Sequence, residues 1–288
     1  MNIQYKAGLA VVRRQLAAFR QTAVAHSSDR LGEHFNQKKG DDQLPLRAEL
    51  FSADQMEQHG KALAGTHALS STGKRDQLLK RLDENEQVLI ETCNLLETVV
   101  KAKLQITPAG EWLLDNFYLI EEQIRTARQH LPKGYSQELP RLAQGPSRGL
   151  PRVYDLALET ISHGDGRVDS ETLRSFVAAY QTVMPLTLGE LWAIPIMLRL
   201  ALIENLRRVG ARITTARIHF NQAQEWANQM MEVAESDPKS LIMVIAGMAR
   251  SNPPMVGPFV AELARRLQGH GPALALPLPW AEQRLAES

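Results

Sequence analysis

Cysteine, aromatic side chains and net charge are all scarce in this sequence. Its 288 residues include one cysteine, Cys93, which excludes an internal disulfide framework. The formal net charge is +1, so no overall electrostatic field favours nucleic acid as a partner. Aromatic residues make up 6%, a low share for an extended sugar-binding groove. Hydrophobic residues make up 44%, so the chain is able to bury a substantial core.

The short motifs of common catalytic and metal sites are missing as well. There is no G-x-S-x-G, no phosphate-binding glycine loop and no G-x-G-x-x-G. The eight histidines form no H-x-x-x-H pair, and one cysteine allows no cysteine-based zinc site. A calcium loop around Gly166 fails because Ile161, His163 and Thr172 would occupy ligand positions. We therefore expect no catalytic residue, no cofactor and no metal site in this chain.

Long hydrophobic runs are also lacking, and the most apolar stretch is Gly189–Arg208. Only two charges, Glu190 and Arg199, precede Glu204 in it, so that a helix there is apolar on nearly every side. Its uninterrupted apolar part, residues 191–198, is far shorter than the roughly 20 residues that a membrane span needs. The stretch is predicted to be a buried core helix.

The start and the one cation of this central helix allow sharper predictions. Thr187 and Glu190 form a T-x-x-E capping box, and Pro195 is expected to kink the helix by removing a backbone donor. Arg199 has no carboxylate three or four residues away. A buried guanidinium needs a partner, so we expect an ion pair with a carboxylate on another helix, in the region Glu111–Glu122.

Apolar residues elsewhere recur at helical spacing, and no stretch shows the alternation of a strand. The prediction is an all-α protein of about ten helices around the kinked, buried central helix. Residues 1–26 are predicted to form a basic amphipathic helix that packs on the protein itself, on a partner helix or on an anionic membrane surface. Residues 27–43 form a polar linker, and residues 44–288 form the helical module.

Three helix starts can be read from capping residues in the first part of the module. Ser52 or Asp54 is expected to begin one helix, and Thr107 followed by Pro108 to begin another. The second helix is predicted to be continuous, because its apolar side is regular as far as Ile124. Asp169 or Ser170 is expected to cap a third.

Large aromatic and acidic residues near the helices are the remaining candidates for a site. One hypothesis is a glycan-binding or interdomain surface, with tryptophan and tyrosine as stacking platforms and acids as polar contacts. The alternative is that the aromatics are core residues and the acids form a charged outer face. Two carboxylates on one helix cannot straddle a glycosidic bond, so cleavage would need a partner elsewhere. The candidate residues are Trp112, Asp115, Tyr118, Glu122, Trp192 and Arg199.

Several long sequence segments resemble, in the same order, segments of the amino-terminal region of bacterial cyclic β-1,2-glucan synthases. The resemblance runs from about Leu46 to Arg284. It rests on Leu46–Phe51, Glu111–Arg125, Leu131–Tyr135, Glu138–Pro140, Pro151–Tyr154, Gly189–Arg208 and Phe259–Leu267.

The resemblance implies a large inner-membrane enzyme that takes glucose from UDP-glucose and extends and cyclises a β-1,2-glucan. None of the family's catalytic residues falls on this chain. We therefore expect a non-catalytic accessory module at the cytoplasmic face of the bacterial inner membrane. Its expected partners are the remaining synthase domains, in the same chain or from a split gene, and β-1,2-glucan. The alternative is a stand-alone helical protein that binds or cleaves glycans.

Overall fold

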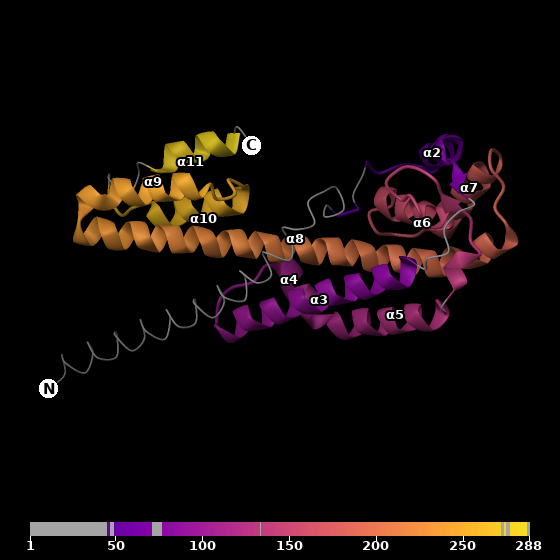
Figure 1. Ribbon diagram of the computed structural model, residues 1–288, viewed down its shortest axis with the longest axis horizontal. Helices are drawn as coiled ribbons and strands as arrows, with labels where there is room; N and C mark the ends of the chain where they lie inside the picture. Colours follow the sequence, from indigo (N-terminus) through magenta and orange to yellow (C-terminus); the bar gives the residue numbers. More distant parts are fainter. Residues whose placement is uncertain are drawn as a thin grey trace. The chain divides into compact units, whose positions relative to one another are not determined.

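The computed structural model describes residues 45–46, 49–70, 77–132, 134–271, 274 and 277–286. Within these residues the chain forms ten α-helices and a single two-stranded ladder, which confirms the all-α prediction (Figure 1). The predicted segments 1–26 and 27–43 lie outside the described residues. The described residues pack as two compact units: the larger unit lies within 38–97 and 105–212, and the smaller unit within 98–104 and 213–288.

Among the described residues, six α-helices and one 3₁₀ helix precede the long helix α8. The bounds are α2 Ala53–Thr66, β1 Leu69–Ser70, α3 Gln77–Lys101, α4 Pro108–Asp115, α5 Phe117–His130, the 3₁₀ helix η2 Tyr135–Gln137, β2 Arg141–Leu142, α6 Arg152–His163, α7 Ser170–Gln181 and α8 Leu188–Ser236. The ladder is antiparallel, with Leu69 opposite Leu142.

Helix starts follow the capping residues of the sequence. Ser52 accepts from the backbone of Gln55 and completes a capping box at α2. Thr107 caps α4, and Asp169 caps α7. These three predicted starts are confirmed. Cys93 is buried on α3, and burial raises the pKa of its thiol to about 12.

The prediction of one continuous helix after Thr107 is wrong, because the helix is interrupted at Asn116, between α4 and α5. Asn116 Nδ2 donates to the carbonyl oxygen of Trp112 at 2.8 Å. An asparagine side chain that takes a helical carbonyl competes with the backbone ladder and favours a break. Periodicity of the apolar residues alone gave no sign of this competition.

Helices α2 and α7 pack closely along one another in the larger unit. The approach depends on Gly60, since an added Cβ there would lie 2.8 Å from the backbone oxygen of Phe176. Phe176, Tyr180 and Leu156 fill the shared core together with Met56.

Helix α8 is longer than predicted and is continuous over 49 residues. It runs through Pro195 and through the expected boundary after Arg208. Gly210, which in a sequence suggests a weak point, instead lets α8 approach α3. A Cβ at Gly210 would meet Thr92 Oγ1 at 3.4 Å and Leu89 at 3.6 Å. Close packing therefore explains this glycine better than a helix end does.

The prediction that the central helix is buried on every side is also wrong. One stripe of α8, with Leu188 and Trp192 70% and 76% exposed, continues through exposed Pro195 to half-buried Arg199. The opposite side holds the core, where Met197 is fully buried. No helix in the described part of the chain is both long and apolar enough to span a bilayer.

Arg199 also departs from its prediction. Among the described residues it makes no ion pair, and it is only half-buried, so that its charge stays hydrated. The fully buried charges of this stretch are two carboxylates, and Arg207 and Arg208 at its end are buried as well. Glu190 and Glu204 are both 0% exposed. Arg152 on α6 pairs with Glu190, and Arg81 on α3 pairs with Glu204.

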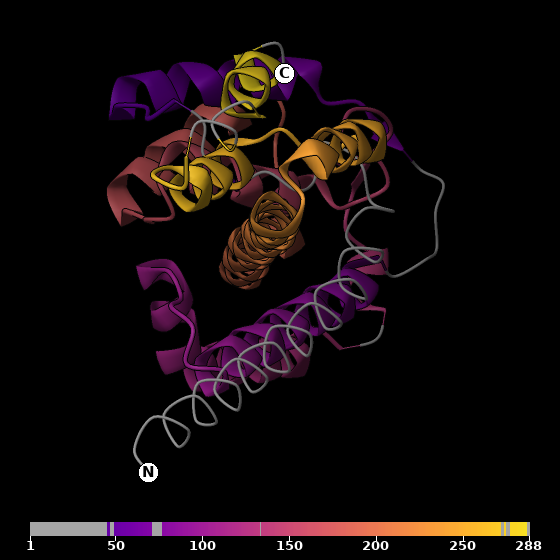
Figure 2. The same ribbon diagram turned by 90° about the vertical axis from the view of Figure 1, so that its left-hand side faces the viewer.

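The smaller unit packs three helices on the carboxy-terminal part of α8. They are α9 Leu241–Ser251, α10 Gly257–Leu267 and α11 Pro277–Ala286, with the 3₁₀ helix η3 Pro238–Ser240 before them. Figures 1 and 2 show them on one side of that part of α8. Their core includes Met230, Met248 and Phe259. Helix η3 begins at Pro238, α10 at Gly257 directly before Pro258, and α11 at Pro277.

Candidate functional site

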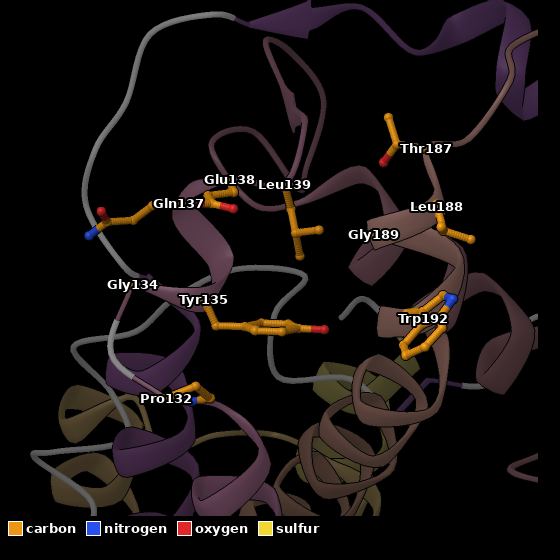
Figure 3. A pocket seen from close by; sticks show the side chains of 10 residues that line it. All are labelled: Pro132, Gly134, Tyr135, Gln137, Glu138, Leu139, Thr187, Leu188, Gly189 and Trp192. Atoms are coloured by element: carbon orange, nitrogen blue, oxygen red, sulfur yellow. The ribbon is translucent and has the colours of Figure 1, made fainter.

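A cavity of about 880 Å³ lies in the larger unit, between the first turns of α8 and the connector after α5 (Figure 3). Volumes of about 300–1,000 Å³ are typical of small-molecule sites. Trp192 lines it and is 76% exposed, so the cavity is accessible from solvent. The lining residues are Pro132, Gly134, Tyr135, Gln137, Glu138, Leu139, Thr187, Leu188, Gly189 and Trp192.

The capping box at the start of α8 sets the first wall of this cavity. Thr187 N donates to Glu190 Oε2 at 2.8 Å, and Glu190 N donates to Thr187 Oγ1 at 3.3 Å. This confirms the predicted capping box. Because the box fixes the first helical turn, Leu188 and Trp192, four residues apart, face the same side.

A buried ion pair holds the same helix start in place. Arg152 of α6 donates to both carboxylate oxygens of Glu190, at 2.6 and 2.7 Å. It also donates to the carbonyl oxygen of Pro185 at 2.8 Å. Burial acts to lower the pKa of Arg152, and Glu190 more than offsets this, so the pKa stays above its usual value. Helices α6 and α8 and the loop before α8 are thus tied together at the start of α8.

The second wall is the glycine-containing connector that follows α5. Gly134 adopts φ +87°, which only glycine adopts freely, and this conformation leads into η2. Arg141 donates to the carbonyl oxygen of Ser136 at 3.1 Å and supports η2 from beneath. In Figure 3 the ring of Tyr135 reaches across the cavity toward the side where Trp192 lies. The cavity therefore offers two aromatic rings, with polar groups at its edge.

Comparison with known proteins relates the chain to one group of enzymes. No protein-family model matches the sequence. The cyclic beta-(1,2)-glucan synthase NdvB of Rhizobium meliloti is 32% identical to it over 243 residues, which are 83% of this chain and 8% of that synthase. This chain is a relative of cyclic β-1,2-glucan synthases. The chain spans less than a tenth of that synthase's length.

The structure places the aromatic and acidic candidate residues predicted from the sequence in two separate regions. Trp192 lines the cavity. Trp112 and Asp115 lie exposed on α4, and Tyr118 and Glu122 lie exposed on α5. These four residues do not line the cavity.

Exposure rules out one of the two interpretations of the aromatics, namely that they are core residues. Trp112 is 53% exposed and Tyr118 is 65% exposed. Trp192 is more exposed than either, so the core alternative is wrong for all three. Helical spacing predicted burial because it cannot tell which side of a helix is covered.

The cavity residues that sequence reasoning missed lie in or between the synthase-like segments Leu131–Tyr135 and Glu138–Pro140. The sequence analysis assigned no role in a site to Tyr135, Gln137 or Glu138. An aromatic residue directly after a glycine in a proline-rich connector was the available signal. Its distance from Trp192 in sequence, 57 positions, hid the pairing.

Proposed function

We propose that this chain is a non-catalytic accessory module of a cyclic β-1,2-glucan synthase system, and that its cavity binds the glucan. In this proposal other domains of the system transfer glucose from UDP-glucose. The proposal is supported by the relationship to the synthase and, above all, by the cavity lined by Tyr135 and Trp192.

The cavity matches the chemistry of a sugar chain. A glucose ring presents an apolar C–H face, which packs against an aromatic ring, and hydroxyl groups, which need polar partners. Trp192 and Tyr135 supply the rings, while Gln137, Glu138 and Thr187 supply polar groups at the lining. The buried pair of Arg152 and Glu190 lies beneath and keeps the helix start preorganised.

The lining favours binding over cleavage. Glycosidases use two carboxyl groups that flank the scissile bond. Of the ten lining residues, Glu138 alone carries a carboxylate. We therefore favour the accessory role over a stand-alone glycan-cleaving protein.

The same proposal includes the surroundings of the module. It would act at the cytoplasmic face of the inner membrane and contact the remaining synthase domains, in the same chain or from a split gene. The surface of α4 and α5 with Trp112 and Tyr118 is a suitable interdomain contact, because large exposed aromatics are enriched in interfaces. An anionic membrane contact through residues 1–26 stays a prediction, since those residues lie outside the described part of the chain.

Calorimetry of the purified chain with linear and cyclic β-1,2-glucans tests the binding role. We expect micromolar binding that Trp192→Ala weakens at least about tenfold, because an aromatic stacking surface contributes about 1.4 kcal/mol or more. Trp112→Ala is the matched control, since it removes an exposed tryptophan outside the cavity.

A β-1,4-linked glucan of equal length controls for linkage and should bind more weakly. Unchanged β-1,2-glucan binding in the Trp192→Ala variant would contradict the cavity. Loss of binding in Trp112→Ala, with Trp192→Ala unaffected, would move the site to α4. Release of shortened glucans during the titration would favour the cleaving alternative.

A further inference from the structure

Two histidines and a glutamate converge in the larger unit, outside the cavity. His59 lies on α2, and Glu159 and His163 lie one turn apart on α6. Glu159 Oε2 is 2.8 Å from His59 Nε2 and 3.3 Å from His163 Nε2. One ligand atom from each of the three side chains lies within 4.8 Å of the others. The three groups thus point at one place.

The other nitrogen of His163 fixes which tautomer the ring holds. His163 Nδ1 lies 2.7 Å from the carbonyl oxygen of Glu49. A carbonyl oxygen only accepts hydrogen bonds, so Nδ1 carries the hydrogen. In the neutral ring Nε2 then presents a lone pair toward the carboxylate of Glu159. Two acceptors facing each other at 3.3 Å need either a proton or a metal ion between them.

This arrangement is the usual one for a metal-binding histidine. Such a histidine donates its remaining N–H to a carbonyl or carboxylate, which fixes the ring and leaves the second nitrogen for the metal. For tetrahedral zinc with bonds of about 2.0–2.1 Å, neighbouring ligand atoms lie about 3.4 Å apart. The separation at Glu159 and His163 already fits, and that at His59 needs to open by about 0.6 Å.

Aromatic packing holds the rings while one side of the cluster stays open. The ring of Phe51 stacks on His163 with centroids 3.8 Å apart, and Phe176 stacks on His59 at 6.1 Å. His163 is 9% exposed, whereas His59 and Glu159 are 25% and 29% exposed. A hydrated ion can therefore reach ligands that are already oriented.

We propose that His59, Glu159 and His163 bind a divalent transition-metal ion of the zinc class, with water completing its coordination. Two imidazole nitrogens and one carboxylate oxygen suit zinc and its neighbours better than magnesium or calcium, which prefer oxygen ligands alone. The site is independent of the proposed glucan cavity. The sequence search for paired histidines or cysteines overlooked it, because the pair on α6 is Glu-x-x-x-His and the third ligand comes 100 positions earlier.

The test titrates the full chain, freed of metal with a chelator, with Zn²⁺ and with Co²⁺. We expect one ion per chain at micromolar affinity or tighter in this site, visible d–d absorption with Co²⁺, and a higher midpoint of thermal unfolding with Zn²⁺. His59→Ala and Glu159→Gln should each weaken binding at least about tenfold and abolish the thermal shift. Mg²⁺ should give neither signal.

His130→Ala is the matched control, because it removes an exposed histidine of α5 and should leave all signals unchanged. Far-UV circular dichroism of the metal-free variants checks folding. Glu159→Gln keeps the size of the side chain, so it serves if His59→Ala fails to fold. Equal Zn²⁺ binding in wild type and Glu159→Gln, or none at tens of micromolar, would overturn the proposal and leave Glu159 in simple ion pairs with protonated histidines.

Discussion

The pattern Glu-x-x-Arg-Arg occurs once in each unit, and both times the glutamate is buried. In the larger unit it is Glu204 to Arg208 on α8, and in the smaller unit it is Glu262 to Arg266 on α10. Glu204 is 0% and Glu262 3% exposed. In both, arginines three and four residues later donate to the glutamate. The local helix geometry is therefore the same in both.

The partners from other parts of the fold differ. Arg81 of α3 donates to both oxygens of Glu204 at 3.0 Å, and Asn85 adds a bond at 2.9 Å. Glu262 receives a neutral partner, Gln224 of α8, at 3.0 Å. The first carboxylate thus accepts from a charged group on a second helix, whereas the arginines that donate to the second lie on its own helix.

The exposure of the arginines differs in the same direction. The side chains of Arg207 and Arg208 are 11% and 9% exposed. Those of Arg265 and Arg266 are 65% and 24% exposed, so water screens their charge. A short helical pattern therefore supplies the ion pair, while the neighbouring helix determines how much the pair contributes to stability.

Neutralising the two glutamates should give the largest difference between the units. Glu204→Gln leaves three largely buried guanidinium groups without their carboxylate and should lower the free energy of unfolding by about 3–5 kcal/mol. Glu262→Gln should cost about 1–2 kcal/mol, because its arginines can turn to water. Hydrogen exchange resolved by peptide measures each unit separately. Equal free-energy costs for the two substitutions would contradict this difference between the units.

The two glutamates should also differ in how their contribution to stability depends on pH. Burial acts to raise the pKa of Glu204, but Arg81 and Arg207 outweigh it and hold the pKa far below its usual range. Burial opposes a lowered pKa at Glu262 too, and Arg265 brings it below the usual value. A lowered pKa stabilises the fold above the unfolded value of about 4.3 and loses this contribution as the pH falls through the folded pKa.

We therefore expect the cost of each substitution to be constant from about pH 6 to 8 and to shrink below about pH 4. The cost of Glu204→Gln should persist to lower pH than that of Glu262→Gln, because its pKa is depressed further. Hydrogen exchange across a pH series, corrected for the intrinsic exchange rate, measures this. A cost for Glu204→Gln that grows on acidification would contradict the assignment.

Replacing single arginines by lysine should give the smallest effects. Arg81→Lys loses one of two parallel bonds to Glu204 and should cost about 1–2 kcal/mol. Arg265→Lys is the matched change at an exposed position and should cost less than about 0.5 kcal/mol. Thermal unfolding of both variants checks the order, which a larger loss for Arg265→Lys would reverse.

The sequence predicted what depends on neighbours along the chain. The capping box at Thr187 and a cap at Ser52 or Asp54 were recognisable, because a cap lies within three residues of its partner. The all-α class followed from the helical spacing of apolar residues, and the synthase relationship followed from long segments that match in the same order. The break at Asn116 was missed, because apolar spacing continues across it.

What the sequence did not predict depends on contacts between distant positions. Burial of Glu190 requires Arg152, which lies 38 positions earlier. The metal-ligand cluster needs His59 beside α6, which follows only from the packing of the fold. Arg199 was expected to be the buried charge of the central helix, but it is half-buried, whereas Glu190 and Glu204 are fully buried. Patterns show that a helix has a covered side, but not which side.

The most direct test of the glucan-binding proposal observes both exposed tryptophans in one sample. The chain is labelled with fluorinated tryptophan, signals are assigned with Trp192→Phe and Trp112→Phe, and ¹⁹F spectra are recorded while linear β-1,2-glucan is added. The account predicts that the Trp192 signal shifts with saturation while the Trp112 signal stays in place. A shift confined to Trp112, or no shift at either tryptophan, would contradict it.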